Sequence, residues 1–311
     1  MTDQLAEDLV AAFDALFGGD PTVRAAHAKG TCIRGTFTAT AEARTLTRAP
    51  HFQGDPVPAT VRFSNGSGDL TASDAGREPR GMAVKFHLDA RKATDIVSIN
   101  HAVFIVRTPE EVIEFMRLRV PDPATGKLDL AALGAFVAAR PESQRAAQLM
   151  LGSPPLESFL RTEYFAQHAF RFVAADGSDR HVRYRWTPAL GVSSLTPEEA
   201  AARSPDYLRE DLLARLAGGP ATFTLDVQLA QPGDDANDPT TEWPGDRERV
   251  VVGTLTLDGP VDDPEKGCER LVFDPTRLCD GIEPTDDKIL HARPRAYAVS
   301  SARRIRARGK R

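Results

Sequence analysis

Two widely separated parts of the chain carry side chains that could move a proton or hold a negative charge. His27 lies within residues 24–30, and a neutral imidazole can accept a proton and return it because its pKa lies near the working pH. Near the other end, Tyr297 follows Arg293 by four residues, which places both on one face of a helix. A nearby cation favours the phenolate form of a phenol, whose ordinary pKa is about 10. Alone, neither residue defines a site, because most single histidines before a strand are surface or capping residues and most helical tyrosines expose their hydroxyl.

Hydrophobic periodicity predicts a mixed fold that must position these side chains. Residues 1–20 are expected to hold an N-terminal helix on the outside of the core, because apolar residues recur at helical spacing before Gly18 and Gly19. Runs typical of strands occur at residues 36–40, 59–64, 82–86, 96–99, 103–106, 169–173, 181–186, 222–229 and 250–257. Further helices are predicted within residues 109–165, 197–203 and 206–216. About eight strands in two sets of four, separated by helices, indicate an α+β barrel that forms one domain over residues 1–311.

Composition limits the kinds of partner. Hydrophobic residues make up 41% of the 311 residues and charged residues 27%, which is enough for a sizeable packed core. The formal net charge of −5 argues against a nucleic-acid partner. The basic cluster that ends the sequence is expected to form a solvated tail over residues 305–311. No apolar run approaches the ~18 residues needed to span a bilayer, so no membrane partner is expected.

The cysteines indicate a reducing environment. Cys32, Cys268 and Cys279 are odd in number, and no two of them have C-x-x-C spacing. Neither a disulfide framework nor a zinc site is therefore expected. The acidic N-terminus has no basic segment followed by an apolar one, so no signal peptide is expected. These features favour a cytoplasmic location.

Several motifs, taken in order, resemble the catalase family closely. They are H-A-K-G after an arginine at residues 24–30, V-R-F-S at 61–64, R-x-P-R-G-x-A-V-K-F at 77–86, H-A-F-R-F-V at 168–173, and G-I-E-P followed by R-x-x-x-Y at 281–297. The resemblance extends from about residue 24 to residue 304. One such motif would be weak, but this many in the family's order make coincidence very improbable. The resemblance implies a catalase-like eight-stranded antiparallel β-barrel with surrounding helices.

The resemblance also implies a cofactor, haem b, and residues that hold it. Tyr297 matches the proximal tyrosine that binds the haem iron. Arg293 matches the arginine that supports this ligand, and His168 matches the histidine that contacts that arginine. Haem propionates are anions that suit arginine forks. The positions that match the family's propionate-binding arginines are Arg24, Arg62 and Arg304.

On the opposite side of the haem, the resemblance implies a site for peroxide. His27 matches the catalytic histidine, which takes a proton from one peroxide oxygen and delivers it to the leaving oxygen. Ser64 matches the serine that hydrogen-bonds this histidine and fixes its tautomer. Asn100 matches the asparagine whose amide orients the bound peroxide. The remaining histidines show no metal-ligand spacing and are expected to be structural.

The implied activity is that of a haem peroxidase with some catalase activity, whose partners are peroxide and a small organic donor. At several pocket positions this sequence has a different side chain from the one usual in the family. These differences are expected to widen the pocket and to admit organic donors or organic hydroperoxides. These positions are Ala26, Glu78, Ile99, Ile105 and Val112.

Two other activities remain open from the sequence alone. One is a hydroperoxide isomerase of the allene oxide synthase kind, and the other is a haem-binding barrel without activity. Because the sequence reaches His27 after one helix and ends soon after Tyr297, the expected assembly is a monomer or a small homo-oligomer, with a dimer favoured. No bound NADPH is expected.

Overall fold

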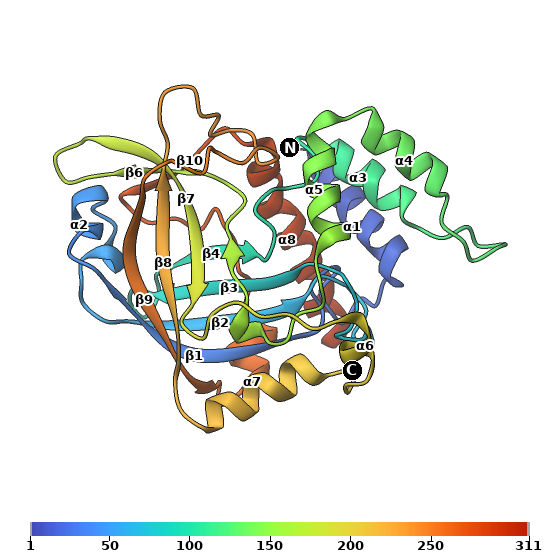
Figure 1. Ribbon diagram of the computed structural model, residues 1–311, viewed down its shortest axis with the longest axis horizontal. Helices are drawn as coiled ribbons and strands as arrows, with labels where there is room; N and C mark the ends of the chain where they lie inside the picture. The colour runs from blue at the N-terminus through green and yellow to red at the C-terminus, as the bar shows by residue number, and fades with distance from the viewer. Residues whose placement is uncertain (1, 310–311) are drawn as a thin grey trace.

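The computed structural model describes residues 2–309, and a closed antiparallel barrel lies at its centre (Figure 1). The barrel strands are β1 (Gly30–Ala39), β2 (Val57–Asn65), β3 (Arg80–His87), β4 (Ala93–Ile99), β5 (Tyr164–Phe165), β7 (Asp179–Pro188), β8 (Ala221–Leu229) and β9 (Arg249–Pro260). They pair in the order β7-β5-β4-β3-β2-β1-β9-β8, and a further pairing of β7 with β8 closes the ring. Two short strands, β6 (Phe170–Val173) and β10 (Ile282–Pro284), extend the sheet from β7. The predicted eight-stranded antiparallel barrel is confirmed for the described residues.

The inside of the barrel is packed with large apolar side chains. Phe37, Phe86 and Trp186 are completely buried there, and their rings meet edge to face. Because side chains alternate along a strand, Val61 and Phe63 of β2 point into this core while Arg62 and Ser64 point to the outer face. The inside of the barrel is therefore a packed core, and its outer face carries the polar residues Arg62 and Ser64.

A layer of helices covers part of that outer face. It comprises α1 (Asp3–Phe17), α3 (Pro109–Leu118), α4 (Leu130–Ala138), α5 (Pro141–Gly152) and α8 (Lys288–Arg308). In Figure 1, α8 lies between the barrel and the other four helices. The layer has its own apolar core, to which α1, α3 and α8 contribute Leu9, Phe115 and Ile289. The remaining helices, α2 (Ala43–Leu46), α6 (Pro197–Ala201) and α7 (Tyr207–Ala217), lie outside this layer.

Local sequence signals explain where the helices of this layer begin and end. Thr108 caps α3, and its side chain exchanges hydrogen bonds with Glu111 in a capping box, next to a proline at the first helical position. Gly18 ends α1 in the left-handed conformation, as the sequence predicts. Among the described residues, none of the helices is both long enough and apolar enough to cross a bilayer.

Two sequence predictions about local structure are wrong. Residues 103–106 form no strand but an irregular buried segment of the helical layer, because a short apolar run can be buried without pairing in a sheet. The predicted solvated tail is part of α8 up to Arg308, whose guanidinium pairs with Glu265 at 2.8 Å and with Glu269 at 3.4 Å. Residues 310–311 of that tail lie outside the described residues.

The expectation of no disulfide is also wrong. Cys32 of β1 is bonded to Cys268 of the short π-helix η3 (Glu265–Glu269), and both residues are buried. The fold brings their Cα atoms to 5.5 Å from positions 236 residues apart, a contact that cysteine spacing cannot reveal. Cys279 is free.

Candidate active site

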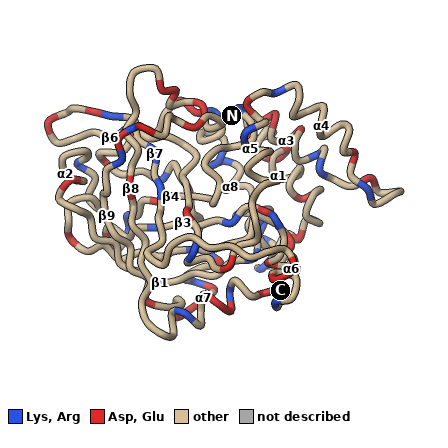
Figure 2. The backbone as a smooth tube through the Cα atoms, viewed as in Figure 1, with Lys and Arg blue, Asp and Glu red and all other residues tan. Residues whose placement is uncertain are grey.

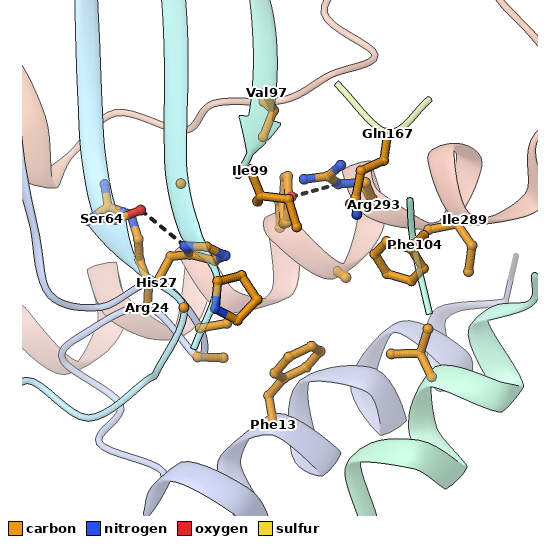
Figure 3. A pocket seen from close by; sticks show the side chains of 18 of the residues that line it. Phe13, Arg24, His27, Ser64, Val97, Ile99, Phe104, Gln167, Ile289 and Arg293 are labelled. Carbon is orange, nitrogen blue, oxygen red and sulfur yellow. Dashed lines mark hydrogen bonds between the residues drawn. The ribbon is translucent and has the colours of Figure 1, made fainter. Parts of the chain in front are cut away.

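A cavity of about 360 Å³ lies between the outer face of β2–β4 and the helices α1, α3 and α8. Figure 3 shows His27 and Ser64 on one side of it and Arg293 on another. The predicted site residues that line the cavity are Arg24, His27, Arg62, Ser64, Arg293, Tyr297 and Arg304. The fold therefore collects side chains from both ends of the sequence around one space.

Strand register arranges the barrel side of the cavity in two rows. Antiparallel partners point to the same face, so Ser64, Gly81 and Ile99 form one row across β2, β3 and β4. A second row contains Arg62 and its partner on β3, Ala83. The small residues are required because a Cβ atom on Gly81 would lie 2.7 Å from Ser64 Oγ and 3.0 Å from His27 Nδ1. Gly81 thus leaves the space in which the imidazole ring lies.

His27 is held in one orientation by its backbone and by Ser64. Its φ is 55°, the one positive φ outside glycine in the described residues, and such a conformation is rare for a histidine. Its backbone N–H donates to Gly66 O at 3.1 Å. Its Nδ1 lies 3.0 Å from Ser64 Oγ, which is the contact that the sequence predicts. This bond leaves Nε2 as the ring nitrogen available to a bound molecule.

The surroundings keep His27 neutral. Burial, together with the smaller effects of the positive charges of Arg62, Arg293, Arg80 and Arg24, lowers the pKa of His27 to about 3. At physiological pH the imidazole is therefore neutral and can accept a proton. This is the protonation state that a general base needs.

Tyr297 stands at the end of a chain of hydrogen bonds that runs back to the start of α8. Arg293 Nε donates to Tyr297 Oη at 2.8 Å, and Arg293 NH1 donates to His168 Nε2 at 2.9 Å. Because arginine can only donate, Nε2 of His168 is the acceptor and Nδ1 carries the proton. That Nδ1 donates to Asp287 Oδ2 at 2.6 Å. The pKa of His168 is lowered by burial, against the opposing effect of Asp287, so the ring is neutral and the tautomer is fixed.

Asp287 is a site residue that the sequence analysis did not assign. Its side chain is completely buried, and Oδ1 accepts the backbone N–H groups of Ile289 and Leu290, which makes it the N-cap of α8. An aspartate directly before a helix is a recognised N-cap signal. The signal could have located the helix start, but it could not have shown that the other carboxylate oxygen holds His168.

The predicted propionate arginines form a cationic cluster with unused hydrogen-bond donors. Arg62 and Arg304 are buried, and the Nε atom of each has no partner among the described residues. Arg24 donates to the Glu269 carboxylate at 3.0 Å and to backbone carbonyls of residues 268–271. The pKa of Arg62 is held well below its usual value by burial and by the nearby charges of Arg24 and Arg304, with Glu269 opposing them. Three cations beside one carboxylate and two unsatisfied buried donors suit a bound anion.

Asn100 was predicted to orient the bound peroxide, but its side chain does not reach the cavity. Its Oδ1 accepts the backbone N–H of Arg80 at 2.7 Å, and its own backbone N–H donates to Arg80 O at 3.0 Å. Asn100 is absent from the cavity wall, whereas the next residue, His101, lines it and bonds Ser153 Oγ at 3.0 Å through Nε2. The amide of Asn100 is thus used to join β4 to the start of β3.

The positions predicted to widen the pocket all line the cavity: Ala26, Glu78, Ile99, Ile105 and Val112. The sequence analysis placed α1 outside the core, but its Leu9, Val10, Phe13 and Phe17 form a wall of the cavity. In Figure 3, Phe13 projects from its helix into the cavity opposite the His27 side. The cavity is therefore apolar over most of its surface.

Comparison with known proteins identifies related chains over nearly the whole length. A family model described as Catalase matches residues 20–310. A catalase-related peroxidase of Synechococcus elongatus is 37% identical over 300 residues, which cover 96% of this chain and 88% of that protein. A catalase-related peroxidase of Mycolicibacterium paratuberculosis is 41% identical over 291 residues, which cover 91% and 89%. A solved structure of a bacterial catalase has a TM-score of 0.82 at 27% identity and covers 91% of this chain, which spans 57% of that one.

Proposed function

The chain belongs to the catalase family, and we propose that it is a haem-dependent peroxidase that reduces hydrogen peroxide or organic hydroperoxides with an organic donor and keeps some catalase activity. One observation carries the proposal. Arg293 and Tyr297, at the end of the hydrogen-bonded chain that starts at Asp287, line the same cavity as the paired His27 and Ser64, which lie on another side of it. One set can supply an anionic oxygen ligand, and the other can move a proton.

The residues of the cavity fit haem b. Tyr297 would bind the ferric iron through its phenolate oxygen, a ligand type known from catalases. The buried Nε atoms of Arg62 and Arg304 lack partners in the part of the chain that the structure describes, and the propionates would satisfy them, with Arg24 beside them. When bound, the haem supplies the redox chemistry that breaks the peroxide O–O bond.

On the proximal side, the chain's own residues position the ligand. Arg293 donates a hydrogen bond to the Tyr297 oxygen. His168 and Asp287 hold the arginine in place. The chain therefore fixes the position of the ligand oxygen.

On the distal side, His27 moves one proton. The neutral Nε2 accepts the proton of the peroxide oxygen that binds, and it returns that proton to the oxygen that leaves. Ser64 keeps the ring in position through Nδ1. Apolar walls that include Phe13, Ile99 and Phe104 (Figure 3) exclude bulk water from this transfer. With a two-electron donor, the net products are water, the alcohol or second water from the peroxide, and the oxidised donor.

The alternative of an inactive haem-binding barrel is opposed by the preserved geometry of His27 and Ser64. A hydroperoxide isomerase would use the same cavity but would consume no donor and evolve no oxygen. Measurement of donor oxidation and oxygen evolution on the same preparation separates these activities.

The test is the Tyr297→Phe variant of the haem-loaded protein. The wild type should show a haem Soret band, oxidise a phenolic dye in the presence of peroxide and evolve some oxygen from hydrogen peroxide. Tyr297→Phe should change the Soret band and lose these activities, because phenylalanine offers no ligand oxygen. An unchanged spectrum in Tyr297→Phe, or a wild type that turns over no peroxide, would refute the proposal.

We also propose a cytoplasmic location and a small assembly, a monomer or a dimer. Cell fractionation tests the location. Analytical ultracentrifugation of the purified protein tests the assembly.

A further inference from the structure

Arg119 is a cation in the wall of the cavity that the proposed chemistry leaves unused. It is the C-cap residue of α3 and lines the cavity. Its guanidinium lies 5.6 Å from the centre of the Phe115 ring, and its NH1 lies 3.9 Å from the Met116 sulfur. No carboxylate forms a salt bridge with it among residues 2–309. Burial lowers the pKa of Arg119, and the carboxylate of Glu78 offsets part of this effect.

Glu78 is the acidic group whose charge acts on Arg119. It also lines the cavity and forms an ion pair with Arg80 at 2.7 Å. Arg80 precedes Gly81, and Gly81 packs against the His27 ring. Because Glu78 is already paired with Arg80, it compensates the charge of Arg119 only in part, and Arg119 has no ion pair of its own within residues 2–309. An anion that enters the cavity can therefore stabilise this half-buried charge.

The wall that leads to Arg119 is long and apolar. On α3, Val112, Phe115 and Met116 line the cavity before Arg119, and the seven residue steps from Val112 to Arg119 rise about 10 Å along the helix axis. The neighbouring α1 contributes its Leu9–Phe17 face along a similar length, and α5 adds Ala146 and Met150. This shape and chemistry match an extended apolar chain with a negative group at one end.

We propose that the organic hydroperoxides accepted by this cavity are amphipathic monocarboxylates, with their carboxylate bound by Arg119 and their apolar chain lying between α1, α3 and α5. This inference rests on the proposed peroxidase function and names its substrate class. Hydrogen peroxide has neither a carboxylate nor an apolar chain, so the anchor acts on larger substrates alone.

The reaction on such a substrate leaves the anchor unchanged. The O–O bond of the hydroperoxy acid breaks, His27 returns the proton to the oxygen that stays on the carbon chain, and the product is a hydroxy acid. The other peroxide oxygen becomes water with two protons and two electrons taken from the organic donor. The carboxylate takes no part in the chemistry and stays on Arg119 until the product leaves.

The test compares Arg119→Gln with Arg117→Gln, an exposed arginine on the same helix that does not line the cavity. Each haem-loaded variant is assayed with a hydroperoxide of an eighteen-carbon fatty acid and with the methyl ester of the same hydroperoxide. A hydrogen bond to a charged group contributes about 1.5–3 kcal/mol. The acid-to-ester ratio of kcat/KM should therefore fall about 10- to 100-fold in Arg119→Gln, mainly through KM, and should not change in Arg117→Gln.

Binding of an unreactive probe tests the anchor without turnover. Dodecanoate should bind the wild type more tightly than dodecanol by isothermal titration calorimetry, and Arg119→Gln should remove this difference. Equal losses for acid and ester would mean that Arg119 only stabilises the end of α3, and the proposal would fail. If instead no peroxide at all is turned over, the proposed function fails, while dodecanoate binding still decides whether Arg119 is a carboxylate anchor.

Discussion

The two charged parts of the cavity are built in opposite ways. From Asp287 through His168 and Arg293 to Tyr297, the side chains are joined by hydrogen bonds within the chain, so this side holds its arrangement without a ligand. In the arginine cluster, the buried Nε atoms of Arg62 and Arg304 have no partner among residues 2–309. The first arrangement stabilises the fold while it positions a ligand atom. The second costs stability until an anion binds, and such a cost is typical of a binding site.

The largest expected effect comes from the disulfide beside the arginine cluster. η3 holds Arg24 through the Glu269 carboxylate and Arg304 through the Glu269 carbonyl, and Cys268 ties η3 to β1. Replacing both bonded cysteines, Cys32→Ala with Cys268→Ala, should lower the free energy of unfolding by about 4 kcal/mol, since the loop that the bond closes is very long. Denaturant unfolding of the haem-free protein measures this loss.

Cys279→Ala is the matched control for that measurement because Cys279 is free. The double variant should also bind haem more weakly, while its Tyr297 side stays intact. Loss of stability without any weakening of haem binding would show that η3 does not support the arginine cluster.

The disulfide also shows what the sequence could and could not predict. Alternating strands and ordered motifs predicted the barrel, and they placed His27, Ser64, Arg293 and Tyr297 around one space, because each signal lies within a short stretch of chain. The bond between Cys32 and Cys268 joins residues 236 positions apart. Nothing in cysteine spacing reports such a contact.

The direction of side chains at the ends of helices and strands was the other feature that the sequence could not predict. Asn100 follows the last residue of β4, and strand alternation no longer fixes its direction there, so its bond to Arg80 was not predictable. The amphipathic pattern of α1 predicted a helix, but it could not show that its apolar face covers a cavity rather than a packed core.

The complete side of the cavity should be sensitive to loss of Asp287. Asp287→Ala removes the cap of α8 and leaves the Nδ1 proton of His168 without an acceptor. The lost cap and the buried unsatisfied donor should together lower the free energy of unfolding of the haem-free protein by roughly 3 kcal/mol. Asp286→Ala, at an exposed neighbouring position, is the control. A loss below 1 kcal/mol would mean that this side is not held together as described.

In the arginine cluster, loss of a side chain should have the opposite effect on the free energy of unfolding. Arg62→Met removes a buried cation whose Nε has no partner, so the haem-free protein should be as stable as the wild type or more stable by about 1 kcal/mol. Haem affinity should fall about 10- to 100-fold, since a charge-assisted contact to a propionate is lost. Haem titration followed by the Soret band checks this, and a destabilised haem-free Arg62→Met variant would break the contrast between the two sides.

The smallest effect concerns the pH dependence of His27, which lies in the field of both charged parts. A group whose pKa is depressed to about 3 stays neutral above that pH and gains its proton only as the pH falls through it. The kcat/KM for peroxide should therefore change less than about twofold between pH 5 and pH 7. A histidine with an ordinary pKa of about 6.5 would instead lose most of its neutral form as the pH falls from 7 to 5.

Burial is the main cause of the lowered pKa of His27, and Arg62 is the largest of the charges that add to it. Arg62→Met should thus raise the pKa of His27 and move the acid limb of the pH profile upward, but only by a fraction of a pH unit, because the ring stays buried. An acid limb near pH 6.5 in the wild type would show that the imidazole is solvated in the working enzyme. An acid limb that moves downward in Arg62→Met would show that the arginine cluster does not act on the distal histidine.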